Sequence, residues 1–152
     1  MNVCSATSAP PNQNVSRSET ISSAKNEEEK WDIRVATWLE QVNKVHPLKK
    51  DRRGIFITRK GRKVGVHAAG EERDGWNFEF ENRPVNVSVL LAEDKNRYLH
   101  PYVLPPKFLQ NHWKFGESAD RWIRKVDGTV VLAIGNDNIS IQEYEGDYSA
   151  LQ

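Results

Sequence analysis

Basic side chains gather in residues 49–63 of this 152-residue sequence, and they are the most suggestive candidates for a binding site. Asp51 is the one acid in that segment. A phosphate backbone attracts such a cluster whatever its base sequence, and a two-stranded ribbon can enter a major groove. The segment therefore predicts a nucleic-acid-binding module, with DNA as the first expectation. The predicted phosphate contacts are Lys49, Lys50, Arg52, Arg53, Arg59, Lys60, Arg62 and Lys63.

Two other interpretations of the basic segment stay open. Lysines and arginines at a hairpin tip also keep a protein soluble and prevent edge-to-edge strand pairing. The same charges could bind an acidic protein, which would make the chain a protein–protein interaction domain. On that alternative Trp113, on a short amphipathic helix, is a candidate partner anchor, although packing in the core is the favoured role for it.

A set of carboxylates gives a third alternative. Asp74 is followed by Glu93-Asp94-Lys95 at the end of an apolar stretch. This pattern resembles the PD-(D/E)XK nucleases, and the resemblance implies Mg²⁺ held by the acids beside a positioned water. The segment 93–97 also fits an ordinary turn that directs these groups into solvent, and the turn is favoured. Catalysis by Asp74, Glu93 and Lys95 remains an alternative, and only this alternative requires a cofactor, Mg²⁺.

The remaining reactive side chains, four histidines and one cysteine, indicate no zinc site and no internal disulfide. His46, His67, His100 and His112 show no paired spacing typical of a zinc site, and His67 is expected on an exposed face. The single cysteine, Cys4, has no partner for an internal disulfide, which fits a reducing compartment. We find no secretory signal or membrane span in the sequence and expect a cytoplasmic or nuclear protein, with the oligomeric state undetermined.

The elements that must position these residues begin with a helix. Residues 1–25 are rich in Ser, Asn and Pro and are expected to form a disordered tail, and 26–152 a single domain. Asn26 is a predicted N-cap. Apolar residues recur from Trp31 to Val45 at helical spacing, and Pro47 follows them, so a helix is predicted over 27–45.

Strands are predicted for most of the rest. The apolar period changes to two at Gly54, and a hairpin turn is expected at 59–62. Residues 85–92 are apolar on both faces, which predicts a central strand, whereas Pro101 predicts an edge or bulged strand. A short helix should start at Pro105-Pro106, followed by a hairpin around Asp127-Gly128. Short links favour antiparallel pairing, so we expect an α+β fold with a curved sheet or open barrel of about seven to eight strands.

Overall fold

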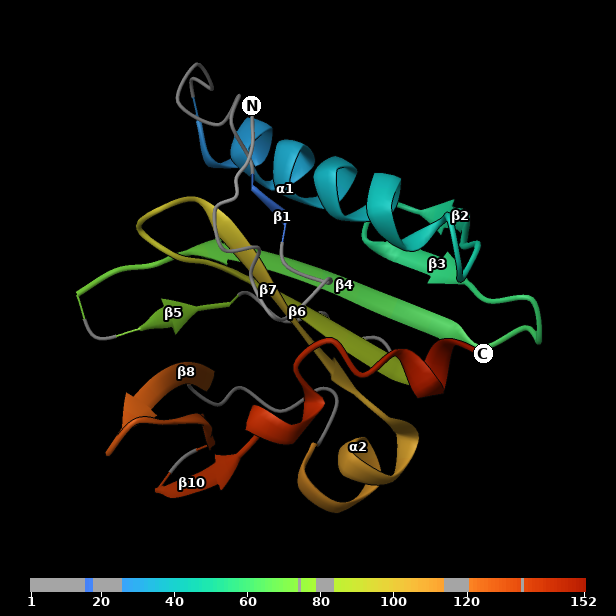
Figure 1. The fold of residues 1–152 in the computed structure, drawn as a ribbon. Helices are drawn as coiled ribbons and strands as arrows, with labels where there is room; N and C mark the ends of the chain where they lie inside the picture. The colour runs from blue at the N-terminus through green and yellow to red at the C-terminus, as the bar shows by residue number, and fades with distance from the viewer. Residues whose placement is uncertain (1–15, 18–25, 74, 79–83, 114–120, 135) are drawn as a thin grey trace.

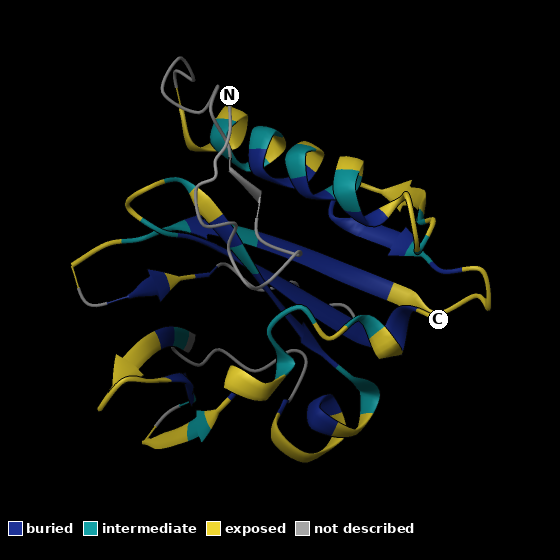
Figure 2. Cartoon of the chain, viewed as in Figure 1, coloured by how far each residue is buried: buried dark blue, intermediate teal, exposed yellow. Residues whose placement is uncertain are grey.

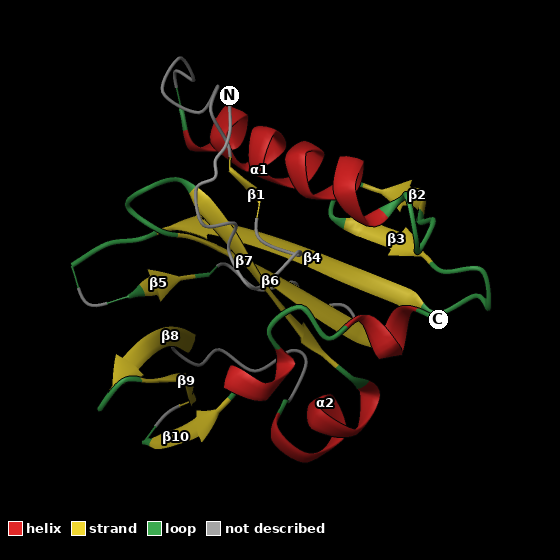
Figure 3. Ribbon diagram, in the orientation of Figure 1, coloured by secondary structure: helices red, strands yellow, loops and turns green. Residues whose placement is uncertain are grey.

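The fold is α+β, as predicted, and it contains two sheets (Figures 1 and 3). The computed structural model describes residues 16–17, 26–73, 75–78, 84–113, 121–134 and 136–152. Within these residues a six-stranded sheet has the order β1-β7-β6-β4-β3-β2, and a four-stranded sheet has the order β10-β9-β8-β5. Neither sheet closes on itself, because each order ends in an unpaired strand edge.

Helix α1 (Glu27–Val42) begins where the sequence predicts. The side chain of Asn26 accepts a hydrogen bond from the Glu29 backbone N–H at 2.9 Å, which caps the first turn. The apolar stripe is buried against the sheet, with Trp38 1% exposed. The helix ends three residues before the predicted Val45, which is 72% exposed and so has no burial to extend the helix.

The six-stranded sheet is antiparallel except at its centre. Its strands are β1 (Ser16–Arg17), β2 (Lys49–Arg52), β3 (Ile55–Ile57), β4 (Lys63–Gly70), β6 (Val87–Glu93) and β7 (Tyr98–Leu104). β4 and β6 run parallel, with Val64 opposite Val87 and Gly70 opposite Glu93. Parallel strands require a crossover, which here is the long excursion through β5 (Trp76–Asn77) into the smaller sheet.

Two cores lie on opposite faces of this sheet. Every residue of β6 is buried, and Figure 2 shows the central strands in dark blue. Val89 and Leu91 face α1, whereas Leu90 and Ala92 face the smaller sheet and helix α2 (Pro106–His112). This two-sided burial is why residues 85–92 show a continuous apolar run instead of alternation.

The smaller sheet closes the second core, whereas Ala150 and Leu151 at the C-terminus pack in the first core, beside α1. β8 (Arg121–Val126), β9 (Thr129–Ile134) and β10 (Asp137–Ser140) form an antiparallel meander with the predicted hairpin turn, where Asp127 has φ 51° and Gly128 φ 79°. Two short 3₁₀ helices, η2 (Gln142–Tyr144) and η3 (Tyr148–Leu151), return the chain to the large sheet.

Several local expectations change with tertiary context. Residues 49–52, between the predicted helix and the first predicted strand, form strand β2, because the turn at Gly54, with φ 78°, brings them alongside β3. Ser16 and Arg17 pair with β7, although the predicted tail is otherwise outside the described residues. Strand β7, which carries Pro101, lies second from the sheet edge, and β1 pairs with it only at Tyr98 and Leu99.

Candidate functional site

The eight predicted phosphate contacts occupy one end of the large sheet. They lie on the outermost strand β2, on the turn to β3, on the turn between β3 and β4 and at the first residue of β4, and all eight are exposed. That turn is tight: the Gly61 N–H donates to the Thr58 carbonyl at 3.0 Å, and Gly61 has φ 84°. The turn therefore holds its cations at the tip of a hairpin, away from either core.

Three of the eight already have partners. Arg53 pairs with Asp32 at 2.7 Å and Glu28 at 4.0 Å, and its guanidinium lies 4.3 Å from the Trp31 ring centroid. Arg52 is 3.7 Å from Asp51. Arg62 donates to the carbonyl of Ala150 at 3.1 Å and so fixes the C-terminal segment. These arginines contribute to the fold, and their charges are partly neutralised.

The other five cations have no ion pair with any acid that the structure describes. We call them the basic edge: Lys49, Lys50, Arg59, Lys60 and Lys63. Lys49 and Lys63 stand on either side of Ile57 in the strand register, so they share one face of the sheet about 10 Å apart. Lys50 lies opposite Phe56, on the face that carries α1. The basic edge thus surrounds the end of the sheet on both faces and at the hairpin tip.

The basic edge also has a structural use. β2 is an edge strand with open hydrogen-bonding groups, and charged side chains on such a strand oppose pairing with another chain. This role needs the charges to repel a second strand, whereas phosphate binding needs them to act together. The two roles therefore predict a different effect of salt on the affinity for nucleic acid.

The carboxylates of the nuclease alternative are engaged elsewhere. Glu93 remains on β6 and points inward, where its Oε1 accepts from Arg34 Nη2 at 3.1 Å and Nε at 3.3 Å. Its side chain is 7% exposed, so the expectation that Glu93 points into solvent is wrong. Lys95 lies in the turn between β6 and β7 and is exposed, while Asp74 lies outside the described residues. Glu93 and Lys95 therefore do not share a site.

The histidines include one arrangement that the sequence analysis did not find. His100 on β7 is held between two carboxylates, with Nδ1 2.8 Å from Glu145 and Nε2 2.8 Å from Asp94. The hydrogen bond to Glu145 raises the pKa of His100; partial burial opposes this, and Asp94 adds to the increase. Among the described residues, no group of three His, Cys, Asp or Glu side chains could hold a metal ion.

One other expectation about a single residue is wrong. His67 is 7% exposed, because the smaller sheet covers the face of β4 that the sequence suggested was free. Trp113 is 5% exposed within the second core, the role that the sequence favoured for it, and it cannot serve as a partner anchor in this state. The error over His67 arises because a second layer covers a sheet face that sequence periodicity alone treats as solvent-facing.

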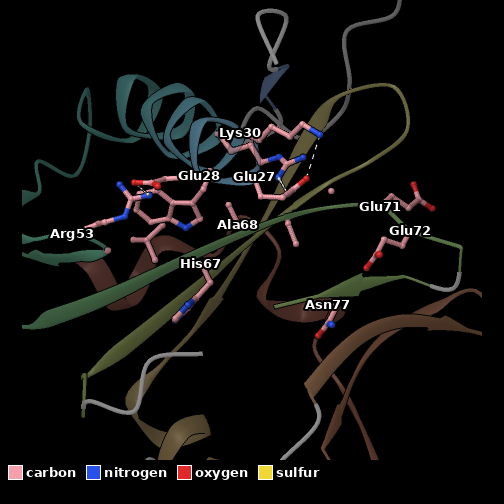
Figure 4. A pocket seen from close by; sticks show the side chains of 15 residues that line it. Glu27, Glu28, Lys30, Arg53, His67, Ala68, Glu71, Glu72 and Asn77 are labelled. Atoms are coloured by element: carbon pink, nitrogen blue, oxygen red, sulfur yellow. Dashed lines mark hydrogen bonds and ion pairs between the residues drawn. The ribbon is translucent and has the colours of Figure 1, made fainter. Parts of the chain in front are cut away.

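A cleft of about 1060 Å³ lies beside the first half of α1 (Figure 4). Its walls are α1 and the start of β5, and strand β4 runs along it from Val66 to Gly70. Charged side chains line its rim. They are Glu27, Glu28, Lys30, Arg34, Arg53, Glu71 and Glu72.

Sequence reasoning missed the part of Arg34 in this region. Arg34 lies three residues after Trp31 and four before Trp38, so it falls within the apolar stripe of α1. A charged residue in such a position must find a buried partner, and that was the available signal. The partner, Glu93, is 59 residues away in sequence and could not be identified from local pattern.

The chain matches no protein-family model, and the comparisons with curated proteins and with solved structures give no match either. No helix among the described residues is long and apolar enough to cross a membrane.

Proposed function

We propose that this chain is a nucleic-acid-binding module that contacts the phosphate backbone through the basic edge, with duplex DNA as the first substrate to test. The observation that supports the proposal is the placement of five exposed cations at one end of the sheet without acidic partners among the described residues. Cations of this kind release counterions from the nucleic acid on binding and act without regard to sequence.

The proposal assigns different weights to the eight predicted contacts. Lys49, Lys50, Arg59, Lys60 and Lys63 would make the phosphate contacts. Arg52, Arg53 and Arg62 contribute less, because an ion pair or a carbonyl already engages each guanidinium. Binding should then be sequence-independent, since contacts to phosphate position a protein without reading bases.

Affinity for a fluorescent DNA duplex measured across a salt series tests the proposal. Five phosphate contacts give a slope of about −4.5 for log K against log salt, which means an affinity loss of roughly 500-fold between 50 and 200 mM. No binding at 50 mM, or binding that does not weaken by 200 mM, would overturn the proposal. A single-stranded probe should give a shallower slope, of about −3.5 for the same five contacts.

A charge-neutralised variant with a matched control makes the test specific to this surface. The combined substitutions Lys49→Gln, Lys50→Gln, Lys60→Gln and Lys63→Gln should remove most of the salt-dependent affinity. The control is Lys95→Gln, Lys107→Gln, Arg124→Gln and Lys125→Gln, an equal charge change at four exposed cations away from the basic edge. Equal loss of affinity in both variants would show that overall charge, and not the basic edge, binds DNA.

A further inference from the structure

The second half of strand β4 has an unpaired edge. Strand β3 is only three residues long, and its register with β4 ends at Ile55 opposite Gly65. One further bond continues along that side, from the Val66 N–H to the Gly54 carbonyl at 2.8 Å. No strand in the described part of the chain pairs with β4 beyond this point on the β3 side.

The direction of the backbone groups follows from the strand period. Successive residues of a strand direct their N–H and C=O groups to opposite sides, so Ala68 and Gly70 point the same way as Val66. Glu71 confirms the alternation, because its N–H donates to the Glu93 carbonyl on the β6 side at 2.8 Å. The edge of Ala68 and Gly70 therefore faces away from β6, and both residues are only partly buried.

This open edge runs along the cleft beside α1. Val66, Ala68 and Gly70 all line the cleft, and Figure 4 shows β4 passing between α1 and Asn77 on β5. Five residues of β4 span about 16 Å, and a neighbouring strand would lie about 4.8 Å away. A cleft of about 1060 Å³ along such an edge has the form of a slot for one more strand, continuing the line of β3.

The rim of the cleft selects the charge of that strand. Glu27, Glu28, Glu71 and Glu72 line it, against Lys30, Arg34 and Arg53. Glu27 pairs with Lys30, Glu28 with Arg53, and Arg34 with Glu93 inside the protein. Glu71 and Glu72 therefore leave the cleft lining with an excess of two acids. Glu72 is exposed and has no ion pair with a described residue. The imbalance favours a ligand that carries positive charge.

We propose that this cleft binds an extended segment of a partner protein that bears basic side chains, by adding a strand to the open edge of β4. Main-chain hydrogen bonds to Ala68 and Gly70 supply the affinity, and the acidic rim selects the sequence. One row of ligand side chains lies toward Trp31 beneath α1, and the other toward His67 and Asn77. The site is separate from the basic edge and independent of DNA binding.

The test uses the full chain and a probe of defined composition. The probe is a capped, fluorescein-labelled heptapeptide of alternating lysine and valine, titrated up to about 1 mM. We expect saturable binding, and we expect the amide protons of Ala68 and Gly70 to exchange at least about tenfold more slowly in the complex. No binding, or protection confined to residues outside the cleft, would overturn the proposal.

Two control peptides separate strand addition from charge attraction. The same heptapeptide with every amide N-methylated keeps its lysines but cannot donate main-chain hydrogen bonds, so its binding should be lost. Equal binding of the methylated peptide would refute strand addition. A heptapeptide with glutamate in place of lysine should bind at least roughly fivefold more weakly than the lysine peptide.

A protein variant and its control complete the test. Glu72→Lys should weaken binding of the lysine peptide roughly fivefold. Glu143→Lys, an equal charge change on η2 outside the cleft, should leave it unchanged. Protection of the Ala68 amide that rises with protein concentration alone would overturn the assigned occupant, because the edge would then be filled by a second copy of this chain.

Discussion

The guanidinium of Arg34 on α1 and the carboxylate of Glu93 at the end of β6 form a buried ion pair, with Nη2 3.1 Å from Oε1. Both side chains are at most 7% exposed. The pair fixes the first half of α1 on the C-terminal ends of the parallel strands β4 and β6, beside the cleft. It also removes Glu93 from the role that the nuclease pattern gave it.

Breaking this pair should destabilise the fold strongly. Glu93→Ala leaves the buried guanidinium with only the exposed carboxylate of Glu27, 3.9 Å from Nη1, and we expect a loss of about 3 kcal/mol in the free energy of unfolding measured with urea. Asp32→Ala, which breaks the exposed pair with Arg53, is the control and should cost at most about 1 kcal/mol. Similar losses for the two variants would contradict the buried character of the Arg34–Glu93 pair.

Stability should depend on pH through His100. Its pKa is raised above the ordinary 6.5 mainly by the hydrogen bond to Glu145, so the protonated form is favoured in the folded state. That stabilisation is fully present below pH 6.5 and is lost as the pH rises through the folded pKa. Tyr102, two residues further along β7, stays neutral while His100 titrates, because burial raises its pKa well above 10.

The measurement is the difference in unfolding free energy between the unsubstituted chain and His100→Gln, from about pH 5.5 to pH 9. We expect the difference to be largest at the acidic end and to shrink with rising pH. His112→Gln is the matched control, because that ring contacts Phe108 and pairs with no carboxylate in the part of the chain that the structure describes. A difference that grows with pH would contradict a raised pKa of His100 in the folded state.

Gly75 should not tolerate a side chain. It has φ 140°, and a Cβ added there would overlap the carbonyl oxygen of Ile123 on β8. Gly75→Ala should therefore cost about 3 kcal/mol or more and separate β5 from β8. Gly61 also has a positive φ, but a Cβ added there would meet nothing within 4 Å. Gly61→Ala should therefore lower the free energy of unfolding by only about 1 kcal/mol. Equal losses by thermal or urea unfolding would argue against the close approach at Gly75.

The C-terminal 3₁₀ helix should depend on one hydrogen bond between tertiary neighbours. Trp38 Nε1 donates to the hydroxyl of Tyr148 at 3.0 Å, across 110 positions of sequence. Tyr148→Phe keeps the ring and leaves a buried indole N–H without its acceptor, which should cost about 1 kcal/mol. Tyr144→Phe, whose ring packs edge-on to Phe108, is the control and should cost less than about 0.5 kcal/mol. Spectroscopic titration should also place ionisation of Tyr148 near pH 12, because burial raises its pKa.

The sequence by itself determined the elements whose signals are local. The Asn26 cap and the apolar stripe predicted α1, the period-two pattern predicted β3 and β4, and Asp127-Gly128 predicted the hairpin of β8 and β9. The α+β class followed from these elements. The exposure of the cations at 49–63 was also predictable, since a hairpin tip has no core to contact.

Tertiary structure alone decided which faces are covered and which charges remain available. Nothing local to Glu93 indicates Arg34, and nothing local to His100 indicates Glu145, because the two members of each pair lie on elements distant in sequence. His67 is buried because the smaller sheet covers a face of β4 that periodicity marks as free. The open edge of β4 likewise exists because β3 begins only at Ile55, opposite Gly65, a pairing length that only the assembled sheet fixes.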